Sequence, residues 1–262
     1  MKIDDPTPKS FLDHLEDLRW VILKGLAVLV VGMVACLAFV KPLLQLLYVP
    51  LRRAGQEPES MLRVLGVVDP LSIQIELGLT GGVILALPFI LYFIAGFLLP
   101  ALTRREARAI LPALAAGAVL FLGGVAFCFQ WILPQTLRWF DSLNHYMGIR
   151  TEWTLQNYID FVLQMLLAFG VSFEMPLVLV ILNVLGIVSS AALRHYRRHV
   201  FLGIVVLACC VVPSTDPFSL GMLVVPMYVL FELTILVTGF LERKKVDSAE
   251  WPGQWPDDGP QG

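Results

Sequence analysis

The stretch YIDFVLQMLLAFGVSFEMPLVLVILNVLGIV, residues 158–188, is apolar over almost its whole length but carries Glu174 close to its centre. About 20 apolar residues cross the hydrocarbon core of a bilayer, so this stretch predicts a membrane-spanning helix. A charge at the centre of such a helix costs roughly 2.5–3.5 kcal/mol on insertion scales. Pro176 cannot donate to the helix, and the carbonyl of Ser172 therefore loses its partner. A buried acid beside a helix break indicates a functional site that faces protein, a water-filled cavity or a partner; a structural role in tying down the break is the alternative.

The composition of the whole chain is that of an integral membrane protein. Of its 262 residues, 57% are hydrophobic and only 15% are charged, whereas about a quarter of the residues of soluble domains are charged. The mean hydropathy is +0.76. The net charge of −2 gives no reason to expect a nucleic-acid partner. The polar N-terminus lacks an apolar core before a cleavage site, so we expect no cleavable signal peptide.

Six apolar stretches predict an all-α, polytopic membrane protein with one six-helix domain over residues 1–242. The acidic, Pro- and Gly-rich end of the chain predicts a disordered tail over residues 243–262. The predicted spans are Trp20–Val40, Leu71–Leu99, Ala109–Gln130, Tyr158–Val188, Val200–Val212 and Phe218–Leu241.

The last two spans are short. Val200–Val212 would rise only about 20 Å as a helix, which is less than the ~30 Å hydrocarbon core. The uncharged part of the last span, Phe218–Phe231, is similarly short. Either one of the two does not cross the membrane, or this side of the molecule thins the bilayer locally. The segment Pro213–Pro217 between them predicts a tight turn, and turn chemistry is the simplest role for Asp216.

The distribution of Lys and Arg predicts that both termini are cytoplasmic. The two ends of the chain and the loops around residues 100–108 and 190–199 together carry 13 basic residues, whereas the other loops carry six. Basic residues favour the cytoplasmic side of a membrane. Residues 41–70 and 131–157 are then long outer loops, and Pro50 together with Asp69-Pro70 bounds a structured extracytoplasmic region.

No catalytic or metal-binding pattern is present in the sequence. It contains no HExxH, GxSxG or P-loop motif, so we expect neither an enzyme nor a cofactor. All four cysteines lie in apolar runs without metal-ligand spacing, and we expect no disulfide and no metal there. A proton-coupled transporter of a small solute, with Glu174 as the proton carrier, is the alternative function. Transporters of that class often have paired broken helices, but Pro88, Pro176 and Pro226 do not map between two halves of this chain.

Six motifs occur in order along the six spans, and together they resemble the TatC family, the receptor subunit of the twin-arginine protein translocase. The resemblance covers about residues 10–242. The motifs are HLEDLR at 14–19, VPL at 49–51, PALTRREAR at 100–108, AFGVSFEMP at 168–176, PSTDPFS at 213–219 and VPMYVLFE at 225–232.

The resemblance implies a cup-shaped membrane protein that binds the twin-arginine signal peptides of folded proteins. Such a protein lies in the bacterial inner membrane, in homo- and hetero-oligomers with single-span TatA- and TatB-type subunits, and works with the proton-motive force. No nucleic acid is implied.

The resemblance also implies where the signal peptide binds. The family has a glutamate in its N-terminal motif and one in the first cytoplasmic loop, which map onto Asp17 and Glu106; Glu16 is the weaker candidate for the first role. Two guanidinium groups of a peptide suit such carboxylates, since these pairs are charge-assisted and can be bidentate. We expect His14, Arg19 and Arg105 beside them. Within the membrane, we expect Glu174 to face the concave interior with Gln164, next to Phe169 and Pro176, and to contact a partner's transmembrane segment.

Overall fold

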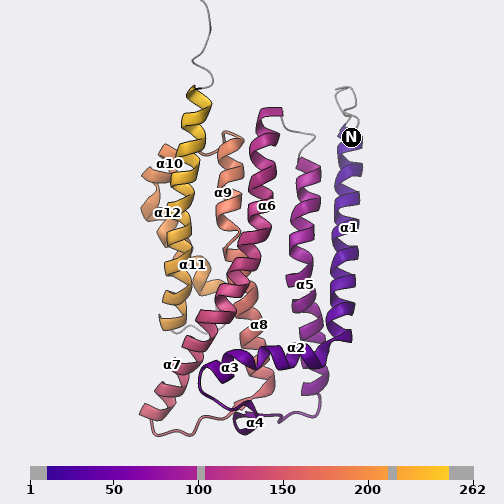
Figure 1. The fold of residues 1–262 in the computed structure, drawn as a ribbon, viewed down its shortest axis with the longest axis vertical. Coiled ribbons are helices and arrows are strands. Elements are labelled where there is room, and N and C mark those ends of the chain that lie inside the picture. The colour runs from indigo at the N-terminus through magenta and orange to yellow at the C-terminus, as the bar shows by residue number, and fades with distance from the viewer. Residues whose placement is uncertain (1–10, 99–103, 212–216, 248–262) are drawn as a thin grey trace, which may run out of the picture.

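The computed structural model describes residues 11–98, 104–211 and 217–247, and nearly all of them are helical. The long helices stand side by side (Figure 1). The helix α1, Phe11–Ala38, begins at the same end of the molecule at which α12, Pro217–Asp247, finishes. We call this the terminal end and the other the opposite end. The predicted all-α, polytopic fold is confirmed, whereas the cup shape stays a prediction.

Five stretches of helix in the described part of the chain are long and apolar enough to cross a membrane. They are Leu15–Ala38, Asp69–Phe97, Pro112–Tyr146, Leu155–Val184 and Pro217–Phe240. The fifth predicted span, Val200–Val212, is not among them; it corresponds to α11, Arg197–Val211, which has 15 residues and rises only about 22 Å. Helix α12 has 31 residues, but Figure 1 shows that it begins above the lower ends of α5 and α8, so the α11–α12 pair reaches less far toward the opposite end.

The two segments that the sequence predicted as long outer loops are largely helical. Residues 40–63 form α2 (Val40–Leu47), α3 (Val49–Arg53), α4 (Pro58–Met61) and the two-residue strand β1 (Leu62–Arg63). At the second segment, α6 (Arg104–Phe127) continues through a π-helical turn, η2 (Cys128–Ile132), into α7 (Leu133–Tyr146). Both segments have few apolar residues in a row but can bury one face against each other.

These two segments cover the opposite end together. Strand β1 pairs in parallel with β2 (Trp153–Thr154), and Leu62 faces Trp153 across the pair. Arg53 donates a hydrogen bond of 3.3 Å to Gln130 in the π-helical turn, and Arg138 of α7 donates to the Arg53 carbonyl. The hydroxyl of Tyr158 donates to the Leu47 carbonyl at 2.6 Å. Residues far apart in the chain therefore close this end.

Helix α8 (Leu155–Ser172) lies in the centre of the molecule and supplies much of the core. Ten of its 18 residues are buried, because it packs against α5 (Asp69–Leu98) and α6. Helix α1 is peripheral and contacts mainly α5, where a Cβ at Gly32 would lie 3.0 Å from the Gly82 carbonyl oxygen. Small residues let membrane helices approach this closely.

The end of α12 differs from the sequence prediction. The disordered tail was expected to start at residue 243, but the helix continues to Asp247. The sequence ERKK after Leu241 consists of good helix formers, which extend the helix beyond the apolar span. Residues 248–262 lie outside the described part of the structure.

Candidate functional site

The predicted break in the fourth apolar span is present beside Glu174. Helix α8 ends at Ser172, and α9, Met175–Val184, begins after a two-residue turn. The Glu174 N–H bonds to the Val171 carbonyl at 3.0 Å, a tighter spacing than in an α-helix. Pro176 stands in the first turn of α9, where a missing N–H costs little. The turn therefore places Glu174 at the N-cap position of α9, in the middle of the membrane-spanning stretch.

The carboxylate of Glu174 is buried against α6 and lacks a hydrogen-bond partner. Its residue is only 9% exposed, and neither oxygen accepts a hydrogen bond from any residue that the structure describes. It makes no side-chain cap on α9 either. A Cβ at Gly117 of α6 would lie 3.0 Å from Glu174 Oε2 and 2.4 Å from Leu177 Cδ2. The glycine therefore leaves the room that the carboxylate occupies.

An unpartnered buried carboxyl group is unfavourable, since it loses its hydration without compensation. Chemically it offers several acceptor sites when ionised, and one O–H donor when protonated. A donor or acceptor on a second polypeptide can satisfy it in either state.

Aromatic rings cluster where α8 meets the end of α6, just before Glu174 in the chain. Phe169 is completely buried, and its ring centroid lies 6.4 Å from that of Phe127 and 6.5 Å from that of Phe173. Gln164 is exposed on α8 whereas Glu174 is buried, so the two differ in burial, and the expectation that both face a concave interior stays a prediction. Ten residues and the helix break separate the two, so helical periodicity across the span does not relate their directions.

The residues expected to bind a signal peptide all lie near the terminal end. Helix α1 contains His14, Asp17 and Arg19, and the first turn of α6 contains Arg105 and Glu106. Both helices begin at the terminal end, with α5 between them (Figure 1). Asp17 is half-buried and Arg19 is exposed. The side chains of His14, Arg105 and Glu106 lie outside the described part of the structure.

Of the two residues expected to have extracytoplasmic structural roles, Pro50 and Asp216, the structure describes only Pro50. Pro50 is buried in the first turn of α3, and its carbonyl accepts a 3.0 Å hydrogen bond from the Ala54 N–H. Asp216 lies outside the described residues.

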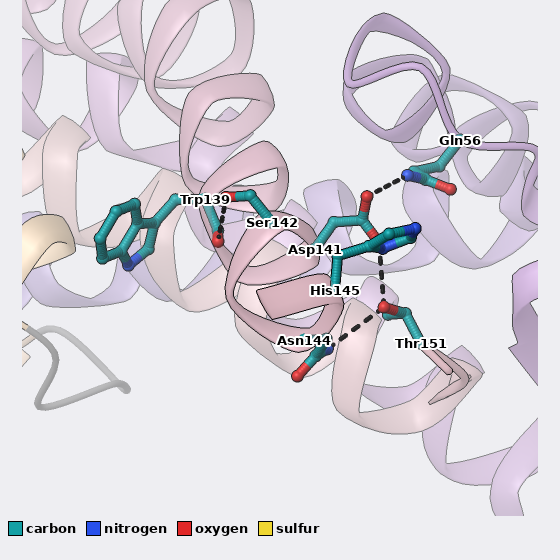
Figure 2. Close-up of polar contacts among 7 residues, drawn as sticks. All are labelled: Gln56, Trp139, Asp141, Ser142, Asn144, His145 and Thr151. Carbon is teal, nitrogen blue, oxygen red and sulfur yellow. Dashed lines mark hydrogen bonds and ion pairs between the residues drawn. The ribbon is translucent and has the colours of Figure 1, made fainter. Parts of the chain in front are cut away.

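A polar network at the opposite end joins α7 to the segment after α3. Asp141 accepts hydrogen bonds from Gln56 Nε2 at 2.6 Å and from Thr151 Oγ1 at 2.9 Å, and His145 Nδ1 lies 3.9 Å from Asp141 Oδ1 (Figure 2). Asn144 donates to Thr151 at 3.3 Å. Gln56, Asp141, His145 and Thr151 are among the residues that line an open cavity of about 440 Å³. The contacts hold three segments of the chain together, and this structural role is sufficient to explain why polar side chains lie here.

Comparison with known proteins places the chain in a family. Residues 13–226 match the family model described as Sec-independent protein translocase protein (TatC). The chain belongs to the TatC family. It is 36% identical over 222 residues to the TatC protein of Synechocystis, covering 85% of each chain, and 34% identical over 229 residues to that of Deinococcus radiodurans, covering 86% of this chain and 84% of the other. A solved structure described as the twin arginine translocase receptor TatC superposes with a TM-score of 0.75 at 29% identity, over 87% of this chain and 98% of that one.

The region that matches the TatC family contains a polar cluster that the sequence analysis missed. Gln156 Nε2 donates to Glu76 Oε2 at 3.0 Å and to Asp160 Oδ1 at 2.6 Å, which brings carboxylates of α5 and α8 together near the opposite end. The only signal in the sequence is two isolated acids near the ends of apolar spans. Their pairing depends on the packing of α5 against α8, which no local pattern reveals.

A second missed residue, Glu242, lies beyond the TatC match. Its Oε1 accepts hydrogen bonds from Asn183 Nδ2 at 2.6 Å and from the Ser190 N–H at 2.8 Å, and its Oε2 accepts from the Ser190 hydroxyl. Burial raises the pKa of Glu242, but the hydrogen bonds from Ser190 and Asn183 and the nearby charge of Arg194 outweigh this, so the pKa lies below its ordinary value. Glu242 therefore ties the turn between α9 and α10 (Ser190–His195) to the end of α12.

Proposed function

We propose that this chain is the receptor and core subunit of a twin-arginine protein translocase. The observation that carries the proposal is the match to the TatC family over residues 13–226, together with a superposition on a translocase receptor over nearly the whole of that structure. The function is to bind the twin-arginine signal peptides of folded proteins and to organise their export, driven by the proton-motive force. The family membership supports this function over the transport of a small solute.

The proposed signal-peptide site is at the terminal end, on the first turns of α1 and α6. Asp17 and Glu106 supply the carboxylates, and the two arginines of the peptide supply guanidinium groups. Such pairs form charge-assisted hydrogen bonds, which are stronger than neutral ones. In this arrangement the terminal end faces the cytoplasm of a bacterium, because 13 of the 19 basic residues belong to the two ends of the sequence and to the loops around residues 100–108 and 190–199. The protein then lies in the inner membrane with both termini cytoplasmic.

The second proposed site is Glu174. Its carboxylate is nine-tenths buried and unpartnered among the described residues, which suits a contact that forms only when another polypeptide is present. We assign this contact to the transmembrane segment of a TatA- or TatB-type subunit. The glycine at position 117 lets α6 pass close to the carboxylate.

Site-specific photocrosslinking tests the signal-peptide site. A photoreactive residue replaces Trp20, which is exposed on α1 about one helical turn from Asp17, and a twin-arginine peptide is added to membranes that contain the full chain. We expect a crosslink that is lost when the two arginines are replaced by lysines. Loss of one charged partner typically costs about 1.5–3 kcal/mol, so Glu106→Gln should reduce crosslinking roughly tenfold or more.

The matched control is Glu59→Gln, which removes an exposed carboxylate at the opposite end. It should leave the crosslink unchanged. A crosslink of equal strength in the Glu106→Gln variant would remove Glu106 from the site, and a crosslink that does not depend on the two arginines would contradict the receptor function.

A further inference from the structure

The chain from Ser190 to Val211 runs alongside α12 in the opposite direction, and three contacts fix its level. The Ser190 N–H bonds to Glu242 at 2.8 Å. A Cβ at Gly239 would lie 3.3 Å from Arg194 Nη2. Arg197 Nη2 lies 3.0 Å from Glu232 Oε2. The segment RHYRRH, residues 194–199, is therefore level with residues 232–239 of α12.

The RHYRRH segment is an exposed basic surface. All six residues are exposed. Arg197 pairs with Glu232, and Arg194 lies near Glu242. Arg198, in contrast, makes no ion pair with any residue that the structure describes. Its positive charge is therefore available to a ligand.

Arg198 lies on a lipid-facing stripe of α11. Residues four apart share one face of a helix, so Arg198, Leu202 and Val206 lie in line. Leu202 is 62% exposed and Val206 is 56% exposed. Apolar side chains exposed on a membrane-spanning helix contact lipid tails. Arg198 is therefore one turn from the tails, on the same face.

Apolar residues of α12 are exposed at the same level as the basic segment. They are Leu233, Leu236, Val237 and Phe240. These side chains require hydrocarbon, whereas the arginines require water or phosphate. Helix α11 rises only about 22 Å, whereas the hydrocarbon core is ~30 Å thick. The bilayer must therefore be thinner beside α11 than elsewhere around the protein. A phospholipid whose phosphate binds Arg198 would give the arginine an anionic partner and would place acyl chains against the apolar side chains.

We propose that the RHYRRH segment is a binding site for an anionic phospholipid, whose phosphate lies on Arg198 and whose acyl chains run along Leu202 and Val206. Arginine suits phosphate because its planar guanidinium group donates two parallel hydrogen bonds. Tyr196, which lies between His195 and His199 at ring-centroid distances of 5.0 and 5.6 Å, is a typical residue of the membrane interface. The acidic residues of the chain's own C-terminal segment, Glu250, Asp257 and Asp258, are the competing occupant.

Native mass spectrometry of the full chain tests the lipid site. The purified protein is incubated with phosphatidylglycerol or with phosphatidylcholine at the same concentration, and the retained lipid molecules are counted. Each arginine near a membrane surface contributes about 1 kcal/mol to the attraction of anionic lipids. We therefore expect the Arg198→Gln variant to retain about fivefold less phosphatidylglycerol, and Arg198→Lys to retain most of it.

Arg150→Gln is the matched control, since Arg150 is exposed at the opposite end. It should retain as much phosphatidylglycerol as the unchanged chain, and the melting temperature in detergent should be the same for both arginine variants. Equal retention of phosphatidylcholine, or equal losses in the Arg198→Gln and Arg150→Gln variants, would overturn the proposal. A clear rise in phosphatidylglycerol retention when Glu250, Asp257 and Asp258 are replaced by their amides would overturn it too, because the tail would then be the resident occupant.

Discussion

At the scale of single residues, Glu174 allows a sharp prediction. We expect Glu174→Ala to reduce export of a folded twin-arginine substrate strongly while leaving signal-peptide binding intact. The carboxylate has no partner among the described residues and does not cap α9. Because a buried polar group without a partner is unfavourable, its removal should leave the melting temperature unchanged or raise it. Export assays and thermal unfolding in detergent are the two measurements.

Glu174→Gln is the companion variant, since it keeps the shape and the ability to donate and accept. If partner contact requires only a hydrogen bond, this variant should export better than Glu174→Ala. Full export by the alanine variant would contradict the functional role. A lower melting temperature together with lost export would instead favour the structural role at the helix break.

A second prediction at this scale concerns Asp17. Asp17→Asn should weaken binding of a twin-arginine peptide about tenfold, because one charged hydrogen bond is worth roughly 1.5–3 kcal/mol. Asp17→Glu should bind at least as well as the unchanged chain, since the longer side chain keeps the charge. Glu16→Gln is the neighbouring control on an exposed position. A harmful Glu16→Gln beside a silent Asp17→Asn would show that Glu16 is the binding residue.

At the scale of elements, the contact between α6 and α8 depends on a glycine. A Cβ at Gly124 would lie 2.7 Å from Phe173 Cγ and 2.9 Å from the Phe169 carbonyl oxygen, so the backbone of α8 cannot yield easily. We expect Gly124→Val to lower the free energy of unfolding by about 1–3 kcal/mol through overpacking. Gly123→Val is a matched control one position away, where a Cβ meets open space. A similar loss in the two variants in a detergent melt would mean that helix propensity, and not packing, is responsible.

The Glu242 contact links α9, α10 and α12 and predicts a pH dependence. The folded-state pKa of Glu242 is lowered, so its contribution to stability is fully present above the ordinary carboxyl pKa and is lost as pH falls through the lowered value. Glu242→Gln should reduce the free energy of unfolding by roughly 1–3 kcal/mol at pH 7. The difference between the two proteins should shrink below about pH 4.5. A difference in melting temperature that stays constant from pH 7 to pH 3 would contradict a role for the charged form.

At the scale of the whole molecule, the level of the two termini predicts an even number of membrane crossings. The start of α1 and the end of α12 lie at one end (Figure 1), which requires α11 to cross in spite of its 15 residues. Single cysteines at Tyr196 and Ser214, in a background without the four native cysteines, should label from opposite sides of the membrane. Tyr196 is exposed directly before α11, and Ser214 follows α11 in the sequence, so the pair brackets this helix. Labelling of both from one side would contradict the six-span topology.

The sequence alone determined the features that depend on local composition. The long apolar stretches, their order and the break between Ser172 and Pro176 follow from residues next to one another in the chain. The reason is physical: a bilayer selects apolar helices of a given length, and a proline removes one backbone donor from the helix in which it stands. The TatC motifs also lie in contiguous segments, so the family could be identified without a structure.

The tertiary structure decided everything that depends on contacts between distant segments. It placed Glu174 against Gly117 and left Gln164 exposed, and it joined Glu76, Gln156 and Asp160 across two helices. It also made helices of residues 40–61 and 133–146 at the opposite end. Short amphipathic helices and buried polar groups become stable only when another segment covers one face or supplies a partner. Such a partner can lie 80 residues away, as Gln156 does from Glu76, and no local pattern in the sequence records it.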